Sequence, residues 1–187
     1  DDYVIPKSLS DKVKGTRVVP ATAGTWNWNM LRQINFFLAH SHQCEDNEVR
    51  ERYEALARFF RAYFYFEKVK RYGDVAWVDE PIDANDETLY RGRDPRAMVM
   101  EHVLEDIDFA IENLPSGKDV YRATKWTALA LKSRIFLFEG TFRKYHGLEG
   151  WETCLQEAAN AASRFIKESG YGIYKSTTTP YRSLFTL

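Results

Sequence analysis

Aromatic side chains outside the predicted helix cores are the residues of this sequence whose chemistry points most directly to a ligand. Trp26 and Trp28 precede the first predicted helix. Trp77 and Tyr90 lie in a long connection, and Trp151 starts a later helix. Indole and phenol rings offer flat apolar faces to sugar C–H groups and a polar edge to hydroxyls. The alternative is that these rings only pack loops against helices.

Motifs for catalysis, metal binding or cofactor binding are absent from the sequence. His40 and His42 are two positions apart and so do not share a helix face. No H-E-x-x-H, nucleophile-elbow, phosphate-binding or dinucleotide-binding motif occurs. We therefore expect no catalytic residue, no metal and no cofactor. The acidic residues of 79–87 could hold a hard cation through oxygen atoms, although a solvated loop is the simpler interpretation.

Composition and charge exclude further classes of partner. The chain has 187 residues, of which 44% are hydrophobic, enough for one sizeable core. Lys and Arg number 26 against 27 Asp and Glu, and the resulting net charge of -1 gives no field that would attract nucleic acid. Apolar runs such as 135–138 are far shorter than the roughly 20 residues that span a bilayer. The chain is therefore not expected to cross a membrane by itself.

Helical periodicity follows an extended leader. Residues 1–25 contain scattered Pro and Gly with little periodicity, which predicts a leader running over a surface. Residues 26–187 are predicted to form one helical domain. Its first helix covers about 28–41, and a second, over 48–71, has an apolar face so wide that it must be buried on more than one side. Gly73 is expected to end that helix.

The connection over residues 74–93 is longer than most structureless loops and is the first place to look for a site. Asp94 and Pro95 then predict a helix start, with the Asp carboxylate capping the first turn and Pro at its first position. That helix ends near Pro115. Two further helices are predicted over 124–145 and 151–169.

The helices form two similar hairpins. The segment FYFEKVKRYG at 64–73 resembles FLFEGTFRKYHG at 136–147, and each bulky helix is followed by one with small residues such as Ala110 or Ala158. This is the packing pattern of tetratricopeptide arrays. The predicted fold class is therefore all-α, a tetratricopeptide-like stack of helical hairpins. Because the end of the array lacks a polar cap, we expect the domain to continue beyond Leu187.

Three stretches together resemble the SusD/RagB family. They are FFRAYFYFEKVKRYGDVAWVDEPI, DPRAMVMEHVLEDIDFAIENLP and ATKWTALALKSRIFLFEGTFRKYH, in the family's order and spacing, and the resemblance extends from about Trp26 to the end. It implies an N-terminal portion of a non-catalytic, lipid-anchored protein on the outer face of the bacterial outer membrane. The implied function is capture of a polysaccharide or oligosaccharide for a SusC-like TonB-dependent transporter, and the anchor would lie upstream of this chain.

Within a glycan-binding protein, the aromatic rings become stacking candidates and neighbouring polar groups become partners for sugar hydroxyls. The predicted site residues are Trp26, Asn27, Trp28, Trp77, Tyr90, Arg91 and Arg93. Two alternatives stay open: a SusD-like binder of peptides, and a helical-repeat scaffold that docks a protein and touches no sugar. Glycoside hydrolysis is a third, because the many carboxylates could supply an acid and base pair.

Overall fold

Helices dominate the computed structural model, which describes residues 8–18, 26–175 and 179–183. In this part of the chain no strand forms, and Val75 and Asp94 make an isolated antiparallel bridge. The predicted all-α class is therefore confirmed. The elements are α1 (Asp11–Lys14), α2 (Asn29–His40), η1 (Ser41–Gln43), α3 (Asn47–Tyr72), η2 (Glu87–Tyr90), α4 (Arg96–Asn113), α5 (Lys125–Tyr145), α6 (Trp151–Glu168) and α7 (Pro180–Ser183).

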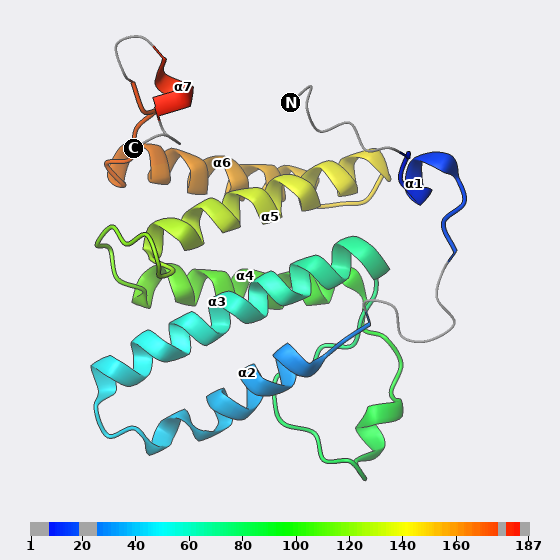
Figure 1. Ribbon diagram of the computed structural model, residues 1–187. Coiled ribbons are helices and arrows are strands. Elements are labelled where there is room, and N and C mark those ends of the chain that lie inside the picture. Colours follow the sequence, from blue (N-terminus) through cyan, green and yellow to red (C-terminus); the bar gives the residue numbers. More distant parts are fainter. Residues whose placement is uncertain (1–7, 19–25, 176–178, 184–187) are drawn as a thin grey trace.

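The leader departs from the extended conformation predicted for it. Residues 11–14 form the single turn α1, which Gly15 closes with a positive φ of 72°. Residues 1–7 and 19–25 of the predicted leader lie outside the described part. Figure 1 shows α1 on the opposite side of the helical stack from the long connection's tip.

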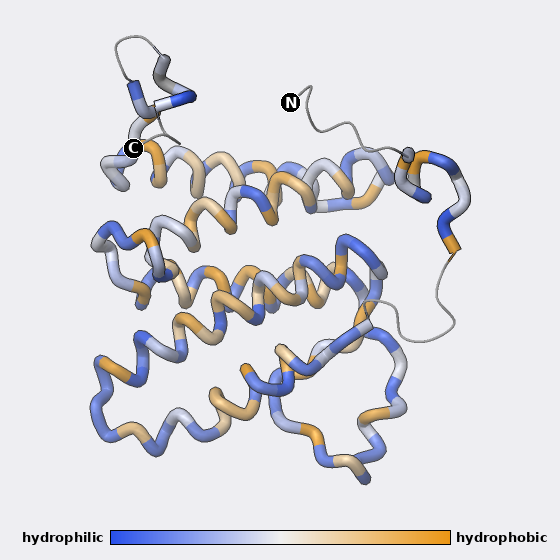
Figure 2. Tube along the Cα trace, viewed as in Figure 1, coloured by the Kyte–Doolittle hydropathy of each residue, from blue (hydrophilic) through white to orange (hydrophobic). Residues whose placement is uncertain are grey.

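The long helices stack in chain order from α2 to α6 (Figure 1). Helices α3 and α4 pack as one hairpin, α5 and α6 as a second, and α4 against α5 joins them. Apolar positions recur along these helices (Figure 2), and those that face the interior form one continuous core. Tyr65, Ile107 and Ile135 are fully buried in it. This arrangement matches the predicted stack of hairpins.

Polar contacts fix both ends of α3. Asp46 precedes the helix, and its carboxylate accepts the N–H of Val49 at 3.1 Å. Gly73 follows the last residue with a φ of 70°, a conformation that favours glycine because a Cβ would be strained there. The predicted end of the helix at Gly73 is therefore confirmed.

The cap of α4 differs from the prediction. Pro95 precedes the helix, and the carboxylate of Asp74 accepts the N–H of Arg96 at 2.9 Å. Asp94 instead accepts the N–H of Trp77 at 2.7 Å. The bridge between the two ends of the connection brings Asp74 to the helix, so the cap comes from 22 residues away.

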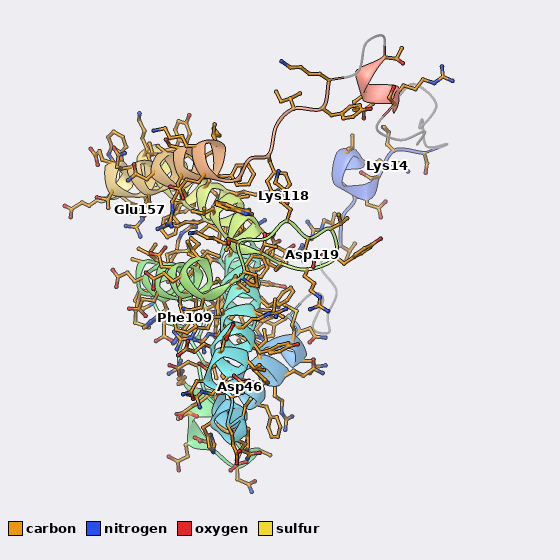
Figure 3. The ribbon with its side chains drawn as sticks, turned by 90° about the vertical axis from the view of Figure 1, so that its left-hand side faces the viewer. Lys14, Asp46, Phe109, Lys118, Asp119 and Glu157 are labelled. Carbon is orange, nitrogen blue, oxygen red and sulfur yellow. The ribbon has the colours of Figure 1, made fainter. Side chains whose placement is uncertain are left out.

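The connection between α4 and α5 joins the two hairpins. Figure 3 labels Lys118 and Asp119 in it. The Lys118 ammonium donates to the carbonyl of Gly170 at 2.6 Å, which ties this connection to the end of α6. At its end Thr124 and Thr127 form a reciprocal capping box that starts α5.

Candidate ligand-binding site

A hollow of about 560 Å³ lies between the start of α2 and the irregular segment that joins α3 to α4. This segment is called the 74–95 connection below. Figure 1 shows this connection running beside α2 and bulging away from the helical stack. The volume falls within the range of about 300–1,000 Å³ that is usual for small-molecule sites. Its lining consists of Trp26, Trp28, Leu31, Arg32, Asn35, Val78, Glu80, Pro81, Ile82, Asp83, Ala84, Thr88 and Leu89.

Two indoles form one wall of the hollow. The ring centroids of Trp26 and Trp28 are 5.0 Å apart at an interplanar angle of 75°. Behind them, Trp28 contacts Phe64 edge-on at 5.5 Å and Trp26 contacts Tyr72 at 4.7 Å. Both indoles are half-buried. A rigid pair of this kind presents apolar ring surface without a large loss of side-chain entropy on binding.

The opposite wall is a loop held by side chains from α2 and α3. The Tyr65 hydroxyl accepts the N–H of Val78 at 2.6 Å and lies 3.2 Å from the carbonyl oxygens of Ala76 and Val78. The amide of Asn35 donates to the Val78 carbonyl at 2.8 Å. Burial raises the pKa of the Tyr65 hydroxyl well above its usual value. The hydroxyl therefore stays protonated, and the start of the loop is fixed.

Trp77 belongs to this anchored part and is 7% exposed. Its ring lies parallel to the imidazole of His102, with centroids 4.6 Å apart, and 4.3 Å from the ring of Tyr65. Two rings thus pack against the indole, and the small exposed fraction leaves little ring surface on which a sugar could stack. The predicted role of Trp77 in sugar stacking does not fit this position. The contacts instead indicate that Trp77 packs the connection against α3 and α4.

Tyr90 is at the opposite extreme, with 89% of its surface exposed at the end of η2. It does not line the hollow, although its neighbour Leu89 does. The predicted set is therefore divided: Trp26 and Trp28 are together in the wall, while Tyr90 is exposed to solvent at the end of η2 in the same connection.

The predicted polar residues have local partners. The side-chain oxygen Oδ1 of Asn27 accepts the backbone N–H of Asn29 at 2.8 Å, at the start of α2. Arg91 pairs with Asp94 at 2.9 Å, and the guanidinium of Arg93 lies 5.4 Å from the ring centroid of Trp26. Arg93 thus contacts the aromatic wall, whereas Asn27 and Arg91 shape the backbone around it.

Asp94 fixes the far end of the connection. Burial raises the pKa of its carboxyl, but the hydrogen bonds from the Trp77 N–H and from Arg91 outweigh burial. The net result is a pKa below the usual value for Asp, so the anchor is charged at neutral pH. An irregular connection is in this way held at both ends by charged or buried polar groups.

Sequence reasoning missed Asn35. This residue is not among the predicted site residues, yet it is 1% exposed and lines the hollow. Leu31 and Leu38 lie four positions before it and three after it, so helical spacing places Asn35 on the apolar face. That spacing is the signal that could have identified it as a buried polar anchor.

Metal ligation and membrane crossing find no support in the part of the chain that the structure describes. No group of three or more His, Cys, Asp or Glu side chains there could hold a metal ion. Cys44 and Cys154 are free thiols. None of the described helices combines the length and apolar character that a transmembrane span requires.

Comparison with known proteins identifies the family. Residues 8–137 match the SusD-like family described as starch-binding and associating with the outer membrane. The chain therefore belongs to the SusD-like family, as its sequence motifs indicated. A SusD-like protein of Bacteroides ovatus is 28% identical over 134 residues, and SusD-like protein P2 of Formosa agariphila is 32% identical over 92 residues. These matches cover 70% and 48% of this chain.

Solved structures support the tetratricopeptide-like fold. A SusD-like protein from Bacteroides fragilis superposes with a TM-score of 0.67 at 28% identity, covering 82% of this chain. A crystal structure with xylogluco-oligosaccharide superposes at 0.69 over 87% of this chain with 22% identity, a likeness of fold. The chain spans 23% of the Bacteroides ovatus protein, 18% of the Formosa agariphila protein and 28% of the Bacteroides fragilis chain.

Proposed function

We propose that this protein binds glycans and that the hollow beside α2 takes part in the contact. The observation that carries the proposal is the pairing of Trp26 and Trp28 on one wall of a 560 Å³ hollow in a SusD-like chain. Family membership, and a neighbour of the same fold crystallised with xylogluco-oligosaccharide, support the same ligand class.

The lining suits a carbohydrate because it combines ring surface with hydrogen-bonding groups. The indoles would contact the C–H face of a sugar, while Arg32, Glu80 and Asp83 would meet hydroxyls around the rim. Sugars present both kinds of surface on one small ring. Tyr90 and Arg93 are proposed as outer contacts for a longer chain, because both are exposed on the same connection.

Electrophoresis through native gels cast with a panel of polysaccharides tests this proposal. We expect at least one polysaccharide to retard the protein, and Trp28→Ala to reduce the retardation. Loss of a central aromatic contact typically costs about 2 kcal/mol or more, some thirtyfold in affinity. Trp151→Ala is the matched control, because Trp151 starts α6 and does not line the hollow.

Each result of this experiment has a definite meaning. Equal retardation of the wild type and a folded Trp28→Ala variant would place glycan binding away from the hollow. No retardation by any polysaccharide would favour a peptide ligand or a protein-docking scaffold. New reducing ends in the incubated polysaccharide would indicate hydrolysis, whereas we expect a non-catalytic binder.

Delivery is the second part of the proposal. We infer that the protein acts at the cell surface, lipid-anchored to the outer membrane, and hands its glycan to a SusC-like TonB-dependent transporter. The family's association with the outer membrane supports this location. Co-purification of such a transporter with the tagged protein, together with protease accessibility on intact cells, would test partner and location separately.

A further inference from the structure

Lys68 of α3 lies in a cage of aromatic rings behind the indole wall. Its side chain is largely buried, with 7% of the residue exposed. The ammonium is 5.0 Å from the ring centroid of Phe64, 5.4 Å from Trp28, 5.7 Å from Tyr72 and 5.8 Å from Trp26. Two of these rings also line the hollow.

The geometry points to a positioning role: we propose that the Lys68 ammonium holds Trp26 and Trp28 in the arrangement that stacks on a sugar. This inference rests on the proposed function, because it concerns the same hollow. The rings come from the segment before α2 and from α3 itself, and the ammonium lies within 5.8 Å of all four ring centroids. It therefore connects a segment without regular structure to a rigid helix.

The physical basis is the attraction between a cation and the negative face of an aromatic ring. This attraction is strongest for Trp and increases when the cation is removed from water. Arg93 adds a second cation 5.4 Å from Trp26, on the side of the 74–95 connection. An indole held by two cations and by edge contacts has few alternative orientations, and a fixed orientation reduces the entropy lost on ligand binding.

Charged groups of the described residues lie near Lys68 on α3 and on the connection. On α3 its neighbours are Glu67, Arg71 and Tyr72, and Glu67 pairs with Lys70 at 2.5 Å. Arg93 faces the same ring cluster from the connection, whereas the segment 26–28 carries no ionisable side chain. Burial lowers the pKa of the Lys68 ammonium, so it loses its charge at a lower pH than an exposed lysine.

Three variants separate charge from shape. Lys68→Met keeps an unbranched side chain but removes the positive charge, whereas Lys68→Arg keeps the positive charge. Lys70→Met makes the same chemical change two residues away, where the ammonium lies over Phe66, a ring that does not line the hollow. Near-ultraviolet circular dichroism without ligand measures the packing of the aromatic rings, Trp26 and Trp28 among them, and gel retardation by the polysaccharide that retards the wild type measures binding.

We expect Lys68→Met to change the near-ultraviolet spectrum and to weaken retardation about tenfold while remaining folded. Lys68→Arg should stay within about threefold of the wild type, and Lys70→Met should match the wild type in both measurements. Raising the pH should move the wild-type spectrum toward that of Lys68→Met, whereas Lys68→Arg, with the same tyrosines, should not follow.

A Lys68→Met protein that keeps both the wild-type spectrum and wild-type binding would overturn the proposal. Equal loss in Lys68→Met and Lys68→Arg would also overturn it, because shape and not charge would then matter. If no polysaccharide retards even the wild type, the proposed function fails. The ligand-free spectrum then decides the role of Lys68: a change in Lys68→Met alone supports it, and no change refutes it.

Discussion

Replacing Asp106 by Asn should destabilise the protein strongly, because it leaves the guanidinium of Arg61 buried without its counter-ion. Arg61 on α3 and Asp106 on α4 form two hydrogen bonds, Nε to Oδ2 at 2.6 Å and Nη2 to Oδ1 at 2.8 Å. Their side chains are 9% and 3% exposed. Removing one partner of a buried pair costs about 3–5 kcal/mol. The corresponding fall in melting temperature is roughly 10 °C for a domain of this size.

A double-mutant cycle gives the sharper measurement. Arg61→Met with Asp106→Leu replaces both charges by apolar groups, so the double variant should be more stable than the single variant Asp106→Leu, which leaves Arg61 buried and unpaired. Urea unfolding followed by circular dichroism measures all free energies of unfolding. Arg164→Met is the control: its partner Glu168 is half-exposed, and the loss should be about 0.5 kcal/mol or less.

Arg61 gives the cycle a second readout because it also contacts the connection. Its guanidinium donates to the carbonyl of Asp79 at 3.4 Å and lies 5.2 Å from the ring centroid of Trp77. Loss of the pair should therefore change Trp77 fluorescence before global unfolding. A folded Asp106→Asn protein that loses less than about 1 kcal/mol, or a cycle with no coupling, would refute this account of the hairpin.

Further predictions concern the second hairpin and the connection. Gly140→Ala should cost about 1–3 kcal/mol by thermal unfolding, because the new Cβ would lie 2.7 Å from Leu155 Cδ2; unchanged stability would mean that Leu155 and α6 shift without cost. Thr124→Ala should cost about 1 kcal/mol through loss of its cap, whereas Thr124→Ser should restore it. Because the Asp94 pKa is lowered, its stabilisation should be present above the unfolded-state pKa and vanish as pH falls through the folded value. Asp94→Asn should remove that acid-dependent loss in denaturant titrations at successive pH values.

The long helices could be predicted because their signals are local. Asp46 before α3, Gly73 after it and the apolar spacing between them are adjacent in sequence, and the observed bounds differ from the predicted ones by a residue or two. The cap of α4 could not be found in this way. Asp94 stands where a local rule expects a cap, but Asp74 takes that role because the bridge between Val75 and Asp94 brings it close.

The same difference between local and distant signals applies to the residues of the candidate site. Trp26 and Trp28 stand together before a helix, and the structure places both in one wall of the hollow, while their role in ligand binding stays a prediction. Trp77 and Tyr90 are equally aromatic and share one connection, yet one is 7% exposed and the other 89%. What separates them is contact with His102 of α4, which is 25 residues away from Trp77 in sequence. Residue type alone therefore does not distinguish an aromatic ring buried against helices from one exposed to solvent.

The 74–95 connection has two parts with different physical roles. Residues 75–80 are fixed by Tyr65, Asn35 and Arg61, whose hydrogen bonds reach successive backbone groups from two helices. Residues 81–90 have mostly exposed side chains. Substitutions in the first part should therefore change stability and binding together, because they release the wall of the hollow. Substitutions in the second part should change which glycan binds while leaving the hairpins intact, since few buried contacts depend on them.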